Sequence, residues 1–156
     1  MNNHIDTLKK TRTFLLSIID GLSTEQLNFI PEGFSNNIIW NFAHLIAAQQ
    51  GICYKRPGLP LVVQDSFFDS FKPGSKPEGT VTEEEITEIK SLALSTVDQL
   101  EKDYDDNLFG NYPSWTTRYG VEVNSIDDGL HFISFHEGMH TGYIMALKRA
   151  LAYQLA

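Results

Sequence analysis

Four segments of this sequence carry apolar residues at the spacing of an α-helix, and this pattern most constrains the fold. The segments cover residues 3–21, 36–54, 82–104 and 125–153. In the first segment the apolar positions are Ile5, Leu8, Leu15, Ile18 and Ile19. Residues that recur every three or four positions line one face of a helix, which must be buried against other elements. The pattern therefore predicts an all-α protein built as a four-helix bundle.

Local signals place the helix ends and the connectors. Ser23 is suited to cap a short turn, Thr82 and Glu85 form a capping box at the third helix, and Ser125 is suited to cap the fourth. Residues 55–81 hold four of the six prolines, which predicts a long connector. We expect its phenylalanines to pack part of it onto the core, namely Phe67, Phe68 and Phe71. A second connector, 105–124, contains a β-like stretch at 121–123.

Composition limits the class of protein. A chain of 156 residues suits one domain, which we place at 1–156. No apolar run approaches the ~20 residues that span a bilayer, and the N-terminus does not resemble a signal peptide. The single cysteine, Cys53, is expected to be a small core residue, and its isolation fits a cytoplasmic location. The net charge of -8 disfavours a nucleic-acid partner.

Three of the five histidines are candidates for a metal site. His136 and His140 differ by about 40° around their helix, so they stack on one face among apolar neighbours. His44 lies within the apolar stretch IIWNFAHLIAA of the second helix. Three inward histidines from two helices can bind one cation and leave positions open, as in catalytic rather than structural sites. The alternative is three separately hydrogen-bonded core histidines. We assign no such role to His4 or His131.

The stretch HEGMH (136–140) also matches the H-E-x-x-H signature of zinc proteases. That class needs a third ligand downstream, and no Asp, Glu or His follows His140. We therefore reject the protease hypothesis. Glu137 is predicted to be a solvated helix residue rather than a group that orients metal-bound water. Trp40 and Tyr143 are expected to be core residues rather than the lining of a pocket mouth.

Two motifs carry a resemblance to a known family. W-N-x-x-H-L at residues 40–45 and H-x-x-x-H-x-G-x-I at 136–144 resemble the DinB/YfiT-like superfamily, and the resemblance covers essentially the whole chain. It implies an up-up-down-down four-helix bundle with long connectors. It also implies a divalent metal held by His44, His136 and His140, with nickel or zinc expected and iron or manganese as alternatives. Tyr143 stands where the common motif has Gln, so no substrate contact is carried over to it.

The same resemblance bears on function. The superfamily includes S-transferases and isomerases that use low-molecular-weight thiols such as bacillithiol or mycothiol, and homodimers are frequent in such families. Our leading hypothesis is a metal-dependent enzyme that transfers such a thiol to a small-molecule substrate. The alternatives are a metal-assisted hydrolase, a non-catalytic bundle stabilised by metal, and a metal-free interaction domain that uses the acidic surface.

Overall fold

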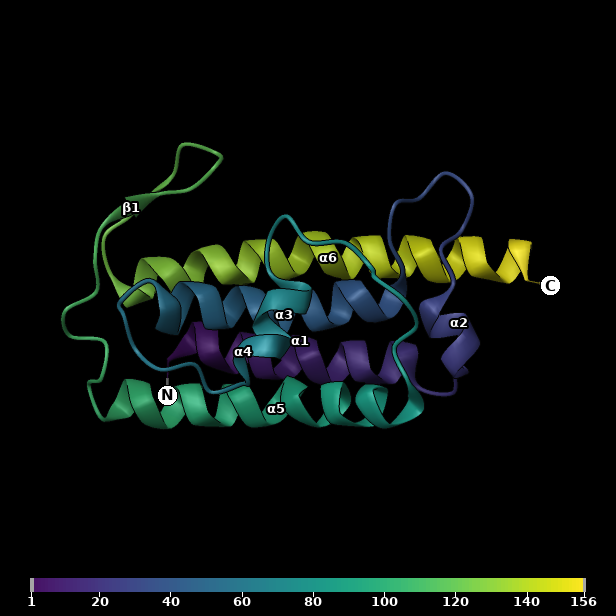
Figure 1. Cartoon of the computed structure of the whole chain (residues 1–156). Coiled ribbons are helices and arrows are strands. Elements are labelled where there is room, and N and C mark those ends of the chain that lie inside the picture. The colour runs from purple at the N-terminus through teal and green to yellow at the C-terminus, as the bar shows by residue number, and fades with distance from the viewer. Residues whose placement is uncertain (1, 156) are drawn as a thin grey trace.

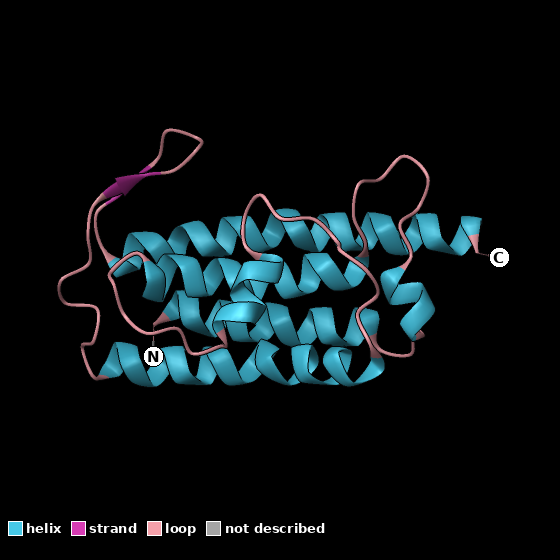
Figure 2. Ribbon diagram, viewed as in Figure 1, coloured by secondary structure: helices cyan, strands magenta, loops and turns pink. Residues whose placement is uncertain are grey.

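The computed structural model describes residues 2–155, and its secondary structure is dominated by helices (Figures 1 and 2). The α-helices are α1 (Asn3–Ile19), α2 (Thr24–Asn28), α3 (Ile38–Gln50), α4 (Asp65–Phe71), α5 (Glu83–Asp105) and α6 (Ile126–Gln154). A π-helical turn, η1 (Gly51–Lys55), continues α3. Two short strands, β1 (Trp115–Thr116) and β2 (Glu122–Val123), pair antiparallel in a hairpin. The prediction of an all-α protein is confirmed.

Hydrogen-bonding side chains start the helices where the sequence indicated. Ser23 caps α2, Thr82 and Glu85 form the capping box of α5, and Ser125 caps α6. Each cap satisfies backbone N–H groups that the first helical turn leaves without partners. The short helix α4 was not predicted, because seven residues are too few to show a helical period. Its phenylalanines pack on the core as expected, with Phe68 buried.

The four long helices, α1, α3, α5 and α6, lie side by side (Figure 1). Helices α1 and α6 run in the same direction, because Asn2 donates to Asp127 at one end and Lys148 donates to the Ile18 carbonyl at the other. Helices α3 and α5 run the opposite way. Near the C-terminal ends of both, the Tyr54 hydroxyl donates to Asp103.

The helix directions are therefore up, down, down and up, and the expected up-up-down-down order is wrong. That order requires two connectors that cross the length of the molecule. Here only residues 56–82 cross it, while residues 20–37 and 106–125 join helices at the same end (Figure 1). The number of residues in a connector does not specify its path, so the sequence left this open. No helix among residues 2–155 is both long enough and apolar enough to cross a membrane.

A buried arginine lies at the centre of the four long helices. Arg12 is 1% exposed and occupies a position in the apolar stripe of α1. Its Nε and Nη2 donate to Glu137 Oε1 on α6 at 2.9 and 2.6 Å. Its Nη1 donates to Gln49 Oε1 on α3 at 2.8 Å. The same nitrogen donates to the carbonyl of Ala93 on α5 at 3.1 Å. Arg12 therefore connects α1 to the other three long helices.

Removing the charge of Glu137 should destabilise the fold strongly. We expect Glu137→Gln to lower the free energy of unfolding by about 3–5 kcal/mol, because the Arg12 guanidinium is left buried without a counter-ion. The measurement is urea unfolding of the metal-free protein. The matched control is Lys9→Gln, which breaks the exposed Lys9–Asp98 pair and should change little because water screens it. Equal losses in both variants would contradict a central role for the buried pair.

Candidate metal centre

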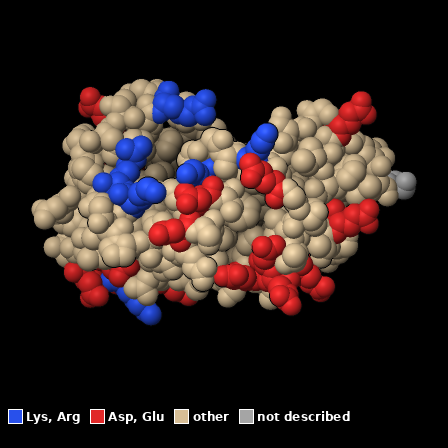
Figure 3. Space-filling model, viewed as in Figure 1, with Lys and Arg blue, Asp and Glu red and all other residues tan. Residues whose placement is uncertain are grey.

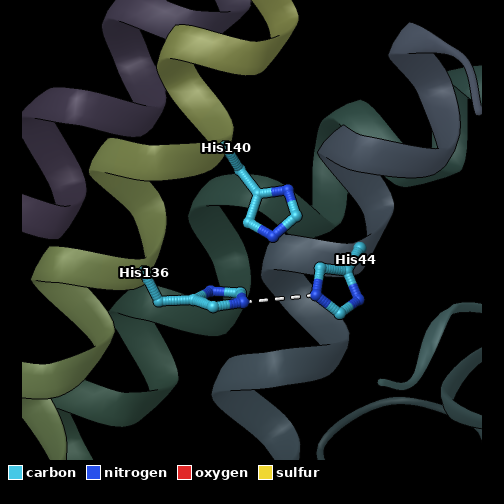
Figure 4. Close-up of side chains that lie close together, drawn as sticks. All are labelled: His44, His136 and His140. Atoms are coloured by element: carbon cyan, nitrogen blue, oxygen red, sulfur yellow. Dashed lines mark hydrogen bonds between the residues drawn. The ribbon is translucent and has the colours of Figure 1, made fainter. Parts of the chain in front are cut away.

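Three histidine rings from two helices meet beside the core. His44 extends from the middle of α3, and His136 and His140 extend from successive turns of α6 toward it (Figure 4). One ring nitrogen of each lies within 4.8 Å of the others. The Nε2 atoms of His44 and His136 are 3.2 Å apart. The structure thus brings together the three residues that the sequence singled out.

Hydrogen bonds on the outer side of two rings set which nitrogen carries the proton. His44 Nδ1 lies 2.7 Å from the Phe71 carbonyl oxygen, which can only accept, so Nδ1 is the donor. His140 Nδ1 lies 2.8 Å from Asn41 Oδ1. The orientation of the Asn41 amide is set by its Nδ2, which donates to Asn36 Oδ1 and the Asn37 carbonyl. In their neutral forms, His44 and His140 therefore present an Nε2 lone pair to the space between the rings.

This arrangement fits a metal ion. Two imidazole nitrogens about 2.1 Å from one cation and about 100° apart are separated by about 3.2 Å. The Nε2 atoms of His44 and His136 have that separation. Donation of the opposite ring N–H to a carbonyl or amide oxygen is also the usual support of metal-binding histidines. His136 Nδ1 is buried and has no hydrogen-bond partner among the described residues.

Burial keeps the three rings neutral. It lowers the pKa of His136 to about 3, and repulsion from His140 or His44, when either is protonated, and from Arg12 lowers it further. It lowers the pKa of His140 to about 4, with a contribution from His44. The pKa of His44 is also lowered by burial, although the Phe71 carbonyl opposes this. Neutral imidazole is the form that binds metals, so the lone pairs are available at neutral pH.

Aromatic side chains surround the cluster. The Trp40 ring stacks on His44 with centroids 4.7 Å apart and planes 11° apart, and the Phe132 ring lies 6.4 Å from His136. Trp40 is buried, as predicted. Tyr143 is 37% exposed and packs edge-on against Phe34, so the prediction that it belongs to the core is wrong. Apolar spacing alone does not show how far the covered face of α6 extends.

Glu137 does not behave as the sequence predicted. It is 1% exposed, and its carboxylate binds Arg12, so the prediction of a solvated residue is wrong. A period of 3.6 shows that Glu137 lies off the histidine face, but it cannot show that α1 covers that side with an arginine. Because its carboxylate is engaged there, Glu137 does not take the general-base position of a zinc protease.

Three groups that build the site were missed in the sequence. Arg12 occupies a position of α1 at which the helical spacing of apolar residues predicts another apolar residue. That position could have marked Arg12 as buried. Asn41 is a polar residue within an apolar helix, which signals a buried hydrogen-bonding role. Phe71 acts through its backbone carbonyl, which no pattern of side chains reveals. Cys53 is fully buried and burial raises its pKa to about 12, which confirms it as a core residue.

The fold and the histidine cluster define a helical protein with a three-histidine site of the kind that holds metals. A comparison with protein families agrees with this class: the profile of the DinB superfamily matches residues 7–144, which include all three histidines. This match covers more than half of the chain. The chain therefore belongs to the DinB superfamily. No curated protein matches the sequence.

The stability of the metal-free protein should fall as the pH is lowered from about 6.5 toward about 4. In the unfolded chain these imidazoles take up protons near the ordinary histidine pKa of 6.5, whereas in the fold the pKa of His136 is about 3 and that of His140 about 4. The unfolded state therefore binds more protons in this window, which lowers the free energy of unfolding. Above about pH 6.5 the contribution is constant.

The measurement is Tm against pH for three proteins. His140→Gln should show a shallower decline than the wild type, because one proton-linked group is lost. His131→Gln is the control, since that side chain is exposed, and it should keep the wild-type slope. If the Tm of His140→Gln fell with pH as steeply as that of the wild type, a lowered pKa of His140 in the folded protein would be contradicted.

Proposed function

We propose that His44, His136 and His140 bind one divalent cation and that the protein is a metal-dependent enzyme. The observation that carries this proposal is the convergence of three neutral ring nitrogens within 4.8 Å. Nickel or zinc is the expected ion, with iron or manganese as alternatives, because imidazole is a suitable ligand for several of these metals. Membership of the DinB superfamily supports the same conclusion.

The surrounding residues hold the ligands in place. The Phe71 carbonyl and Asn41 Oδ1 accept from the outer ring nitrogens and so orient His44 and His140. Trp40 covers one face of His44 and limits its rotation. Burial keeps the rings neutral, so the ligand set is ready without the loss of a proton.

The absence of a fourth protein ligand among residues 2–155 favours catalysis over a structural role. Structural zinc sites have four protein ligands, whereas catalytic sites leave a position open. Glu137, the neighbouring carboxylate, is held by Arg12 of α1. Three ligands would therefore leave room for a substrate atom.

We propose a thiol transfer reaction in which the sulfur of a low-molecular-weight thiol attacks an electrophilic carbon of a small-molecule acceptor. A C–S bond forms, the bond from that carbon to its leaving group breaks, and the thiol proton passes to water. A bound divalent cation supplies Lewis acidity and lowers the pKa of a coordinated thiol. A soft thiolate also suits a borderline-soft metal. The aromatic rings of Trp40 and Phe132 lie beside the cluster and suit an apolar acceptor.

Metal content is the first test. After reconstitution with nickel or zinc and desalting, plasma mass spectrometry should find near-stoichiometric metal in the wild type. His44→Ala and His140→Ala should lose it, while His131→Ala should retain it. The loaded wild type should then consume a low-molecular-weight thiol in the presence of an electrophile, and His140→Ala should not. A wild type that retains no metal would refute the proposal.

The outer hydrogen bond to His140 should affect metal affinity. Asn41→Leu removes the acceptor and should weaken binding by about 10–100-fold, the usual effect of losing such a partner. Asn41→Asp keeps an oxygen facing His140 Nδ1 but loses the two hydrogen bonds that Nδ2 donates, so it should restore part of the affinity. Competition with a chelating dye measures both variants. If the Asp and Leu variants were weakened equally, general damage to α3 would be the better explanation.

A further inference from the structure

A cavity of about 600 Å³ lies apart from the three histidines. It opens between α3, α4 and the first turns of α5, and residues 75–81 form its outer wall. Its volume lies within the range of about 300–1,000 Å³ that is typical of small-molecule sites. None of the three histidines lines it. The cavity is therefore a second candidate binding site.

The charge of the cavity walls is negative. Its carboxylates are Asp69, Glu78, Glu85 and Glu88, and Lys76 is its one cationic lining residue among residues 2–155. Asp69 pairs with Lys72, and Glu85 accepts from the backbone N–H of Thr82. Glu78 and Glu88 make no ion pair within the described part of the chain. Acidic side chains also gather over the first turns of α5 (Figure 3). A cationic ligand would be attracted to these walls.

One buried donor in the cavity wall has no partner. Trp40 lines the cavity and is 7% exposed, and its indole Nε1 has no hydrogen-bond partner among the described residues. A buried N–H left unsatisfied costs about 1–3 kcal/mol, so such groups normally meet a protein, water or ligand acceptor. The nitrogen itself is covered by neighbouring atoms, so an oxygen on a bound ligand would reach this donor only after those atoms shift. Apolar neighbours, including Phe71, Ile89 and Leu92, would contact the body of the ligand.

The cavity shares its wall with the metal centre. The Trp40 ring stacks on His44, and the Phe71 carbonyl accepts from His44 Nδ1. Both residues also line the cavity. A ligand that moves either residue would change the orientation of one proposed metal ligand.

We propose that this cavity binds a small organic amine with an apolar body and an oxygen acceptor, and that its binding changes the metal affinity of the three-histidine centre. The binding site itself is independent of the function proposed above, whereas the effect on metal affinity rests on it.

Tyramine is the probe, because it carries an ammonium group, a phenyl ring and a hydroxyl oxygen. Calorimetry with the metal-free wild type should show one bound tyramine per chain. The matched anion, 3-(4-hydroxyphenyl)propionate, should not bind. Glu88→Gln should weaken tyramine binding about fivefold, the effect expected from loss of one partly screened ion pair. Glu84→Gln, in the same region of α5 but outside the cavity lining, should bind as the wild type does.

The role of Trp40 has its own control. Trp40→Phe keeps a ring against His44 but removes the N–H, so it should weaken tyramine. The affinity for 2-phenylethylamine, which lacks the hydroxyl, should fall less, because that ligand loses only contact with the larger indole ring. Absence of tyramine binding, equal binding of the anion, or equal affinity in Glu88→Gln and the wild type would each overturn the site.

The link to the metal centre is tested by titrating nickel in the presence and absence of tyramine. Nickel and tyramine should change each other's affinity by the same factor, as thermodynamic linkage requires. If tyramine binds but leaves the nickel affinity unchanged, the link is overturned and the cavity site stands. If nickel does not bind at all, the proposed function fails. Tyramine binding to the metal-free protein then still tests whether the cavity is a binding site.

Discussion

The buried ion pair between Arg12 and Glu137 is the contact on which the arrangement of the long helices depends. Both side chains are 1% exposed. A charge this deep is tolerated only when it is paired and hydrogen-bonded, and Arg12 meets acceptors from α3, α5 and α6 at once. Sliding any of these helices along its axis would remove acceptors from the guanidinium. The pair thereby sets the axial register of the helices as well as their proximity.

That register positions the histidine cluster. Glu137 follows His136 directly in α6, so holding its carboxylate against α1 also sets the height and rotation of His136 and His140. Gln49, another partner of Arg12, lies on α3 little more than one turn beyond His44. The two helices that carry the proposed ligands are thus tied to the same guanidinium. In this chain the glutamate of the H-E-x-x-H pattern pairs with Arg12, and its two histidines belong to the cluster.

The geometry around His44 connects the cluster to the rest of the molecule. One face of its ring contacts Trp40, and its outer nitrogen contacts the backbone of α4. Helix α4 belongs to the long crossing connector, so this connector supplies part of the support for the proposed metal centre. The same two contacts form part of the wall of the acidic cavity. The centre and the cavity therefore have two residues in common, Trp40 on α3 and Phe71 on α4, although no histidine is shared between them.

The helical class, the positions of the long helices, the caps of α2, α5 and α6 and the three histidines could be predicted from the sequence, because periodicity and capping depend on residues close together in the chain. The spacing of apolar residues along α1 and α3 could also have marked Arg12 and Asn41 as buried polar residues, but it does not indicate their hydrogen-bond partners. Local sequence does not specify the helix directions, the pairing of Glu137 with Arg12, the exposure of Tyr143 or the support of His44 by the Phe71 carbonyl. These features depend on which helix faces meet, and that is settled by long-range packing. The carbonyl contact is also independent of side-chain identity, so no sequence pattern could have indicated it.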